Sequence, residues 1–325
     1  MSISKLKLAL DELECLSNLA SMLTANPSET PDMFCHQAKT LARRIPQRIL
    51  TTFQEFALHG SPTGFLLIQT APIDDARLPN TPPDNKHHVG ETTELAKIQA
   101  LCMSAIGDMI AYEAEGHGHL FQDIVPTKSL AQKQTSMGSI ELEIHTEQAF
   151  SRLRPDLLSL CCLRGDPEAH TYIMPVKSIC NNLSSYEQDL LHEPLWTIGV
   201  DLSFKLHGHE FMEGDVRGPI SILHGSYQDP QLVFDQDLMK GTNEKSTTLI
   251  QNIVDIYYKE RFTHTFVPGD IVIVDNRRAV HGRSTFHPKY DGKDRFLVRC
   301  FGILDYERTK YARPNDARVI ASVYS

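Results

Sequence analysis

The sequence predicts an α+β protein in which a helical N-terminal third packs on a β-sheet core. One observation is that apolar residues recur at helical spacing over residues 5–25, 30–44 and 46–60. The other is that, after one more helix over residues 92–112, short apolar or alternating segments bounded by turns dominate the chain. The pattern alone does not decide whether the core is a sandwich or a barrel.

The three N-terminal helices are delimited by start and stop signals. The first ends before Asn26-Pro27. Thr30-Pro31 is typical of a capping residue followed by a first-turn proline, so it begins the second helix. The third begins near Pro46 and ends at Gly60.

The later elements follow from turn-bounded apolar runs and from helical periodicity. Strands are expected at residues 65–68, 141–147, 157–163, 171–176, 271–274 and 295–303, and helices at 184–193 and 243–259. Two polar loops, at residues 71–91 and 207–218, are lid candidates. No break in composition marks a linker, so a single domain over residues 1–325 is expected, with a helical region at about 1–60.

Composition narrows the class of protein. The 325 residues are 41% hydrophobic and 22% charged, with a net charge of −9, which gives no basic patch for nucleic acid or a membrane surface. No stretch approaches the ~20 apolar residues that span a membrane, and acidic residues from Asp11 to Glu14 interrupt any signal peptide. Seven cysteines without a CxxC pair indicate a reducing, cytoplasmic setting. Oligomeric state is left open.

A metal site is indicated by the stretch from Glu141 to Glu147, in which polar and apolar residues alternate as in a strand. His145 and Glu147 therefore project together, and Glu143 faces the same side, so the pattern does not choose between the two glutamates. His281 offers a second imidazole. Two histidines and one carboxylate form the facial triad of non-haem Fe(II) oxygenases. A zinc hydrolase and a metal-free amino-acid binding module are the alternatives from other classes.

Several motifs, in this order and spacing, carry a resemblance to a known family. They are His145-Thr146-Glu147, the Arg164–Glu168 turn with Thr171, Phe234–Asp237, Asp275–Arg283 (DNRRAVHGR), and Arg295 with Arg299. With them the chain resembles the clavaminate synthase-like branch of the Fe(II)/2-oxoglutarate dioxygenases, which includes hydroxylases of free arginine, asparagine and lysine. The resemblance covers about Phe65 to the C-terminus. It implies a double-stranded β-helix (jelly-roll) core, with Fe(II), 2-oxoglutarate as co-substrate, and O2.

The resemblance also implies roles for individual residues. His145, Glu147 and His281 would be the iron ligands and so the catalytic centre. Arg295, helped by Thr171, would hold the distal carboxylate of 2-oxoglutarate. Arg299 would hold the carboxylate of an amino-acid substrate. Arginine's planar fork suits both tasks, and residues four apart on a strand share a face with their Cα atoms ~13 Å apart.

The rest of the amino acid would be recognised by acidic and polar residues. By the resemblance, Asp235 and Asp237 would recognise the end of the side chain, Glu115 would hold the α-ammonium group, and Ser136 and Gln122 would line the pocket. Paired carboxylates favour a basic substrate, so hydroxylation of L-lysine ahead of L-arginine is expected, at C3 or C4, with release of succinate and CO2. Asparagine or another polar amino acid, and a desaturase or cyclising oxidase on the same scaffold, are the alternatives.

The remaining histidines are expected to be structural or surface groups. His87-His88 lies in a polar loop, and the pair in His117-Gly118-His119 has no third ligand nearby in the sequence. From the sequence alone, a second metal is therefore not expected.

Overall fold

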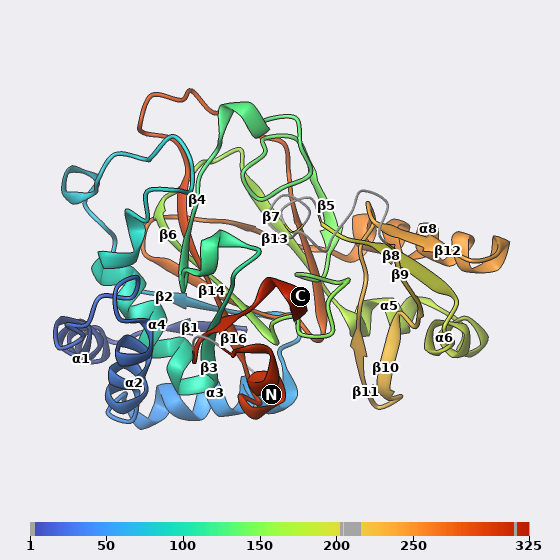
Figure 1. Cartoon of the computed structure of the whole chain (residues 1–325), viewed down its shortest axis with the longest axis horizontal. Helices are drawn as coiled ribbons and strands as arrows, with labels where there is room; N and C mark the ends of the chain where they lie inside the picture. Colours follow the sequence, from blue (N-terminus) through green and yellow to red (C-terminus); the bar gives the residue numbers. More distant parts are fainter. Residues whose placement is uncertain (1–3, 202–203, 205–215, 315–316, 325) are drawn as a thin grey trace.

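The computed structural model describes residues 4–201, 204, 216–314 and 317–324. Helices cover one face of a large sheet, and smaller sheets lie on its other side (Figure 1). The helices are α1 (Leu10–Ser21), α2 (Pro31–Ala42), α3 (Gln47–His59), α4 (Glu94–Ile106), α5 (Val176–Asn182), α6 (Ser185–His192) and α8 (Glu244–Glu260). The expected α+β class is therefore confirmed, and helices α2, α3, α6 and α8 lie where the periodicity placed them.

The large sheet has the strand order β1-β2-β14-β6-β16-β3-β17, and β4 also pairs with β16. Its strands are β1 (Lys5–Lys7), β2 (Phe65–Gln69), β3 (Asp108–Tyr112), β4 (Phe121–Ile124), β6 (Leu157–Arg164), β14 (Asp270–Asp275), β16 (Phe296–Ile303) and β17 (Val319–Ile320). Most neighbours in the sheet are antiparallel, and the β1–β2 and β17–β3 pairs are parallel.

Alternation along the central strands divides the interior into two cores. In β6, Cys161 packs toward the N-terminal helices whereas Cys162 packs on the opposite side of the sheet. Val298 of β16 likewise faces the helices, and Leu297 faces away from them. Odd-numbered residues of β16 therefore point away from the helices, and this parity directs Arg299 to the same side as Leu297.

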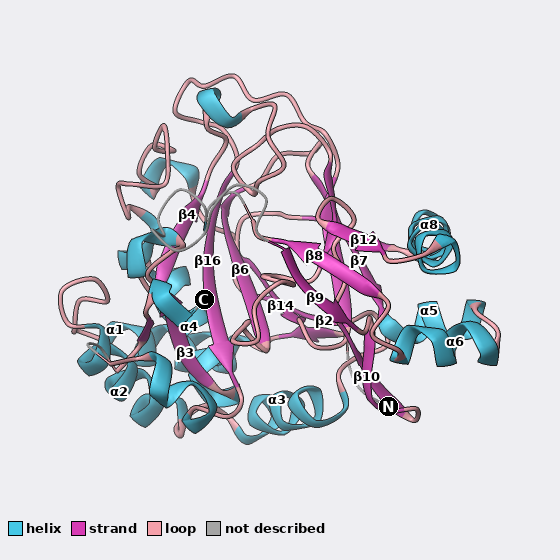
Figure 2. Ribbon diagram, turned by 45° about the vertical axis from the view of Figure 1, so that its right-hand side comes forward, coloured by secondary structure: helices cyan, strands magenta, loops and turns pink. Residues whose placement is uncertain are grey.

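A four-stranded sheet of order β13-β7-β15-β5 faces the large sheet (Figure 2). Its strands are β5 (Leu142–His145), β7 (His170–Pro175), β13 (Phe262–Thr265) and β15 (Ala279–Arg283). There are also two minor sheets. One has the order β12 (Met239–Gly241), β8 (Trp196–Gly199), β9 (Val216–Ile220), and the other pairs β10 (Leu223–Ser226) with β11 (Asp229–Leu232). The strands predicted at 157–163 and 171–176 thus belong to different sheets.

Two helix predictions were wrong at one end. Residues 5–7 of the predicted helix 5–25 form β1, because Leu6 pairs alongside β2 and is buried in the core beneath the helices. The helix predicted over residues 92–112 ends at Ile106, and the chain re-enters the large sheet as β3. At Gly107 a Cβ would lie 2.5 Å from the carbonyl oxygen of Ile303, so the turn demands glycine.

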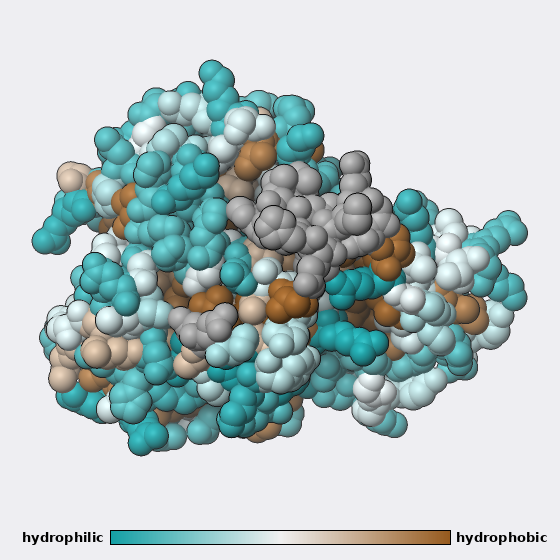
Figure 3. Space-filling view, viewed as in Figure 1, coloured by the Kyte–Doolittle hydropathy of each residue, from teal (hydrophilic) through white to brown (hydrophobic). Residues whose placement is uncertain are grey.

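The surface carries few clustered hydrophobic side chains. On the face in Figure 3 the brown residues form small separate patches among hydrophilic ones. The described residues form no disulfide bond, and the adjacent Cys161 and Cys162 are buried, as expected. Within the described part of the chain, no helix has the length and apolar character needed to cross a membrane.

Most of the loop predicted at 207–218 lies outside the described residues, and from Val216 onward it forms β9.

Candidate active site

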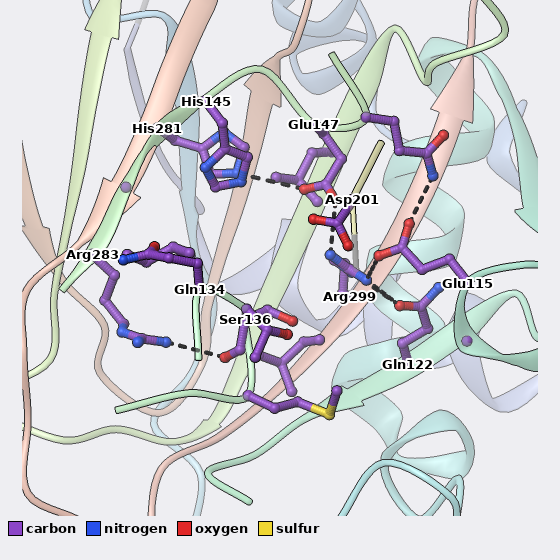
Figure 4. A pocket seen from close by; sticks show the side chains of 18 of the residues that line it. Glu115, Gln122, Gln134, Ser136, His145, Glu147, Asp201, His281, Arg283 and Arg299 are labelled. Atoms are coloured by element: carbon purple, nitrogen blue, oxygen red, sulfur yellow. Dashed lines mark hydrogen bonds and ion pairs between the residues drawn. The ribbon is translucent and has the colours of Figure 1, made fainter. Parts of the chain in front are cut away.

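A cavity of about 430 Å³ lies between the large sheet and the four-stranded sheet. Every residue singled out from the sequence lines it. These residues are Glu115, Gln122, Ser136, His145, Glu147, Thr171, Asp235, Asp237, His281, Arg295 and Arg299. Figure 4 shows how ten of the lining side chains converge. The fold thus brings together segments that lie up to 184 residues apart, such as those of Glu115 and Arg299.

The predicted metal ligands meet at the pairing of β5 with β15. His145 and His281 are directly opposite each other in this antiparallel pair. One ligand atom each from His145, Glu147 and His281 lie within 4.8 Å of one another, and Glu143 is not part of this group. Glu147, and not Glu143, therefore lies where its carboxylate could share a metal ion with the two imidazoles.

Protonation and hydrogen bonding also suit this group to a divalent cation. Nδ1 of His145 lies 2.8 Å from the carbonyl oxygen of Glu143, which fixes the ring and leaves Nε2 as the ligand atom. Burial and the neighbouring His281 lower the pKa of His145, which keeps its imidazole neutral. Burial alone would raise the pKa of Glu147, but Arg299 and His281 outweigh it and lower that pKa to about 2. A neutral imidazole at His145 and an ionised carboxylate at Glu147 are the forms that bind Fe(II).

Glu147 lies just beyond the end of β5, so strand geometry alone does not hold it. Asn276 does this instead, because its Oδ1 accepts a hydrogen bond of 2.8 Å from the Glu147 backbone N–H. Its Nδ2 donates to the carbonyl oxygens of Glu147 and Pro155, at 3.1 and 2.7 Å. The DNRRAVHGR motif therefore supplies both a candidate ligand, His281, and the residue that positions another candidate, Glu147. Sequence reasoning did not single out Asn276.

Replacing Asn276 by alanine is expected to lower the free energy of unfolding by about 1–3 kcal/mol, because it leaves a buried N–H and two carbonyls without partners. Fe(II) binding should weaken by ~10-fold or more, since Glu147 loses its support. Urea denaturation and anaerobic Fe(II) titration measure the two effects. Asn252 lies on α8, and Asn252→Ala removes a half-buried hydrogen bond to Glu187 on α6; this variant is the control and should leave iron affinity unchanged. Unchanged iron affinity in the Asn276 variant would contradict this role.

One region of the cavity is cationic. Arg295 is 5% exposed, its Nε is buried without a partner, and no carboxylate among the described residues pairs with it. Arg283 is also buried, and among the described residues it donates to backbone carbonyls, including those of Ser136 and Ile140 at 3.1 and 2.9 Å. Burial lowers the pKa of Arg295 to about 10 and, with Arg295 nearby, that of Arg283 to about 9. Both remain charged at neutral pH, so this region is suited to an anion.

Thr171 completes this cationic region. It is buried on β7 and lies directly opposite Arg283 in the pairing of β7 with β15. Arg283 is two residues after His281 on the same strand, so the strand periodicity was the signal that could have identified it from the sequence.

Arg299 is at the centre of a second, mixed-charge region. Its guanidinium donates to Oε1 of Glu147 at 2.9 Å and also pairs with Glu115. Gln122 lies on β4, directly opposite Arg299 in the pairing with β16, and its Oε1 accepts a hydrogen bond of 3.1 Å from Nε of Arg299. The predicted substrate residues Glu115, Gln122 and Arg299 thus form one network with an iron ligand (Figure 4). Burial raises the pKa of Glu115 to about 7, although Arg299 opposes this effect.

The third region is acidic and lies beside His145. A backbone bridge joins His145 to Asp235, and the backbone N–H of Gln236 donates to the carbonyl oxygen of Ile144 at 3.0 Å. Asp235, Asp237 and Glu143 all line the cavity. Burial raises the pKa of Asp235 to about 7, against the opposing effect of His145. Three carboxylates facing one cavity are suited to a cationic group.

Two further contributors to the cavity could not be identified from local pattern. Gln148, at a φ of 53°, donates to Glu115 at 2.7 Å and so orients that carboxylate. Asp201 points toward Arg299 (Figure 4) and contributes to the raised pKa of Glu115. By contrast, Arg277 and Arg278 of the DNRRAVHGR motif are structural: both pair with Asp275, and both donate to the C-terminal end of α3.

Two imidazoles and a carboxylate beside unpaired buried guanidinium groups define a class of non-haem iron oxygenase that takes a carboxylate co-substrate. A model of the "Taurine catabolism dioxygenase TauD, TfdA family" matches residues 214–301. The chain is 47% identical over 321 residues to an L-lysine 3-hydroxylase of Catenulispora acidiphila, covering 98% of this chain and 89% of the relative. It is 30% identical to an L-asparagine oxygenase of Streptomyces coelicolor over 94% of this chain and 90% of the relative.

Solved structures agree. An asparagine oxygenase in complex with Fe(II), 2S,3S-3-hydroxyasparagine and succinate superposes with a TM-score of 0.89 at 28% identity, over 98% of this chain and 99% of that one. A non-haem iron oxygenase in complex with Fe and α-ketoglutaric acid superposes with a TM-score of 0.85 at 27% identity, over 97% and 99%. The chain belongs to the clavaminate synthase-like family of Fe(II)/2-oxoglutarate-dependent amino-acid hydroxylases. This membership sets aside the zinc hydrolase and the metal-free binding module.

Proposed function

We propose that this protein hydroxylates free L-lysine at C3, using Fe(II), 2-oxoglutarate and O2 and releasing succinate and CO2. The observation that carries the proposal is the distribution of charge on the two sides of the iron ligands. One side offers a cation and an anion for the α-carboxylate and α-ammonium groups of lysine, and the other side offers carboxylates for its side-chain ammonium group. Arg299 and Glu115 adjoin Glu147, and the acidic residues Asp235 and Asp237 adjoin His145 on the other side. The 47% identity to an L-lysine 3-hydroxylase supports the same substrate and position.

The Arg299–Glu115 ion pair offers a place for the zwitterionic end of an amino acid. A bound amino acid would insert its carboxylate against Arg299 and its ammonium group against Glu115. One internal ion pair is thereby replaced by two to the substrate, so no buried charge is left without a partner. Because Arg299 also contacts Glu147, the α-carbon would lie close to the iron ligands. The carbon next to it, C3, is then favoured over C4.

The side-chain ammonium group of lysine would reach the acidic region. Asp235 is half-buried and would form the stronger contact, whereas Asp237 is exposed and more screened by solvent. Glu143, half-buried on β5, would add a third carboxylate. A neutral side chain such as that of asparagine would leave these carboxylates without a counter-charge, which favours a basic amino acid.

The co-substrate would occupy the cationic region. Arg295, with the hydroxyl of Thr171, would hold the far carboxylate of 2-oxoglutarate, and Arg283 would add positive charge and anchor the backbone of residues 136–140. When bound, iron and 2-oxoglutarate together supply the O2-dependent oxidation that cleaves the C–H bond. The side chains supply placement, because they fix which carbon faces the iron. We place this site in one oxygenase domain built on a double-stranded β-helix.

A substrate screen tests the proposal. The purified enzyme would be given Fe(II), 2-oxoglutarate, O2 and each proteinogenic amino acid in turn, and succinate and product mass would be followed. L-Lysine should give the fastest succinate release and a product heavier by one oxygen atom, with NMR placing the hydroxyl group on C3. A product lighter by two hydrogens would indicate a desaturase or cyclising oxidase instead. Faster turnover of asparagine than of lysine would overturn the proposed substrate.

Recognition of the lysine side chain is expected to depend on pH through Asp235. Because burial raises the pKa of Asp235 to about 7, the carboxylate is ionised above that pH and protonated below it. The KM for lysine should therefore rise ~10-fold as the pH falls from about 8 to about 6. Asp235→Asn should raise the KM ~10²-fold at about pH 8 and remove the part of this pH dependence that Asp235 contributes, which leaves the part due to Glu115.

The exposed Asp237 provides the matched control for Asp235. Asp237→Asn should raise the KM for lysine less and should keep the pH dependence of the wild type. Steady-state kinetics at saturating 2-oxoglutarate separates the two variants. An Asp235→Asn enzyme with wild-type KM for lysine and for arginine would show that this region does not recognise the side chain.

A further inference from the structure

A second group of metal-ligand residues lies outside the active-site cavity. One ligand atom each from His88, Glu91 and His119 lie within 4.8 Å of one another. His88 lies two residues before a short 3-10 helix over Gly90–Thr92, and Glu91 lies within it. His119 directly follows another 3-10 helix over Gly116–Gly118. The two imidazole rings face each other with centroids 3.6 Å apart. This is the same kind of group, two histidines and one glutamate, that the fold assembles at the iron site.

Glu91 is buried without a positive partner. It is 4% exposed, and no lysine or arginine in the described ranges forms an ion pair with it. Its hydrogen bonds come from the hydroxyl of Ser28, at 2.7 and 2.6 Å to the two carboxylate oxygens. Asp123, also buried, lies close enough to repel it and accepts from the backbone N–H groups of Val89 and Gly90. Two buried carboxylates without a cation are costly, and a bound metal ion offsets that cost.

Hydrogen-bond direction leaves both histidines with a free lone pair. Ser28 has one hydroxyl proton, and the Glu91 carboxylate can only accept it. The Ser28 oxygen, 2.9 Å from Nδ1 of His119, therefore accepts from that nitrogen, which leaves Nε2 of His119 as the ligand atom. Nδ1 of His88 is buried and has no hydrogen-bond partner. Two imidazole lone pairs and one carboxylate thus converge.

We propose that His88, Glu91 and His119 bind a divalent cation of the zinc type. Imidazole ligands select Zn²⁺ and its neighbours in the Irving–Williams order over Ca²⁺ and Mg²⁺, which prefer oxygen. An adjoining cavity of about 350 Å³, lined by Ser28, His117 and His119 among others, has room for a water as fourth ligand. Three protein ligands plus water complete a tetrahedral site.

The cation holds together two segments that border the active site. Asn85 and Lys86, just before His88, line the active-site cavity, as do Glu115 and Gly116, just before His119. Glu115 is the residue proposed to take the substrate α-ammonium group. A metal ion between His88 and His119 therefore cross-links the loop that was a lid candidate to the loop that carries Glu115. In the linear sequence Glu91 is far from His119, which is why the third ligand is not apparent there.

Binding of Zn²⁺ and Co²⁺ by the full chain tests the proposal. The variant His145→Ala/His281→Ala, which lacks the iron ligands, would be stripped with a chelator, dialysed against Zn²⁺ and analysed for metal content. It should retain one Zn²⁺ per chain, show a raised Tm with Zn²⁺, and give the intense visible bands of tetrahedral Co²⁺ when Co²⁺ is used. The wild-type chain should bind one more Co²⁺ than this variant.

Single changes on that background identify the ligands. His119→Asn should abolish Zn²⁺ retention and the Co²⁺ bands. His87→Asn is the matched control, because His87 adjoins His88 but faces Asp84 at 3.5 Å, and it should retain the metal. Absence of bound Zn²⁺ and Co²⁺ in the His145→Ala/His281→Ala chain, together with no more than one Co²⁺ in the wild type, would overturn the proposal, whether or not the His119 variant folds. Full retention by His119→Asn would overturn the ligand set.

Discussion

His281→Ala is expected to abolish hydroxylation, with turnover lower by at least ~10³-fold, because it removes one of three iron ligands and leaves a site too weak to hold Fe(II). The direct measurement is optical. Anaerobic enzyme with Fe(II) and 2-oxoglutarate should show a weak visible charge-transfer band, since the keto acid chelates the iron. This band should be absent in the variant. Its survival in His281→Ala would refute the ligand assignment.

Two controls sharpen this result. His287→Ala should retain the band and turnover, because His287 is exposed and its side chain pairs with Glu168, at 3.0 Å, which does not line the cavity. Glu147→Gln and Glu143→Gln form a matched pair, since both residues lie next to His145 in the sequence pattern. Only the change at Glu147 should remove the band. Loss of the band in the Glu143 variant instead would show that the other carboxylate binds the metal.

Much of this site was predictable because short-range pattern and strand pairing agree. Residues two or four apart on a strand must share a face, so Arg295 and Arg299 were expected together, and both line the cavity. The DNRRAVHGR motif forms the end of β14, a turn and β15, and the pairing of β15 with β5 brings His281 opposite His145. Periodicity predicts which face a residue occupies, and the family resemblance supplied the pairing.

What could not be predicted depends on partners that are distant in the sequence. Lys5–Lys7 is a strand only because β2 lies beside it, and Asp108–Tyr112 only because β16 and β17 do. Propensity within a short window contains no information about such neighbours. The assembly of His88 and His119 with Glu91 is hidden for the same reason.

Arg295, just before β16, and Arg299, on β16, show this limit most clearly. Their spacing and residue type are equivalent, so the sequence suggests two free carboxylate anchors. In the folded chain Arg299 already pairs with Glu115 and Glu147, whereas Arg295 has no carboxylate partner among the described residues. The same residue type therefore serves two purposes. Arg299 neutralises internal charge and, in the proposed function, exchanges a partner when the amino acid binds, whereas Arg295 would bind the co-substrate anion.

Because Arg295 has no carboxylate partner among the described residues, Arg295→Ala is expected to have a large effect on the KM for 2-oxoglutarate. Removing the buried guanidinium should raise the KM for 2-oxoglutarate by ~10²–10³-fold, as for the loss of one partner of a buried charge pair. The KM for lysine should change little. Steady-state kinetics with each substrate varied in turn measures the two values. Equal effects on both would refute the proposal that Arg295 serves 2-oxoglutarate alone.

Stability without ligands separates the two arginines a second time. Arg295→Ala should leave the Tm of the metal-free and ligand-free protein unchanged or higher, because burial of an unpaired cation is costly and the change removes that cost. Arg299→Ala should lower the free energy of unfolding by about 3–5 kcal/mol, since Glu115 and Glu147 would lose their shared cation. A strongly destabilised Arg295→Ala protein would mean that Arg295 holds the fold together. A stable Arg295→Ala protein that no longer binds 2-oxoglutarate would mean that the buried charge of Arg295 serves binding of the co-substrate and not stability of the fold.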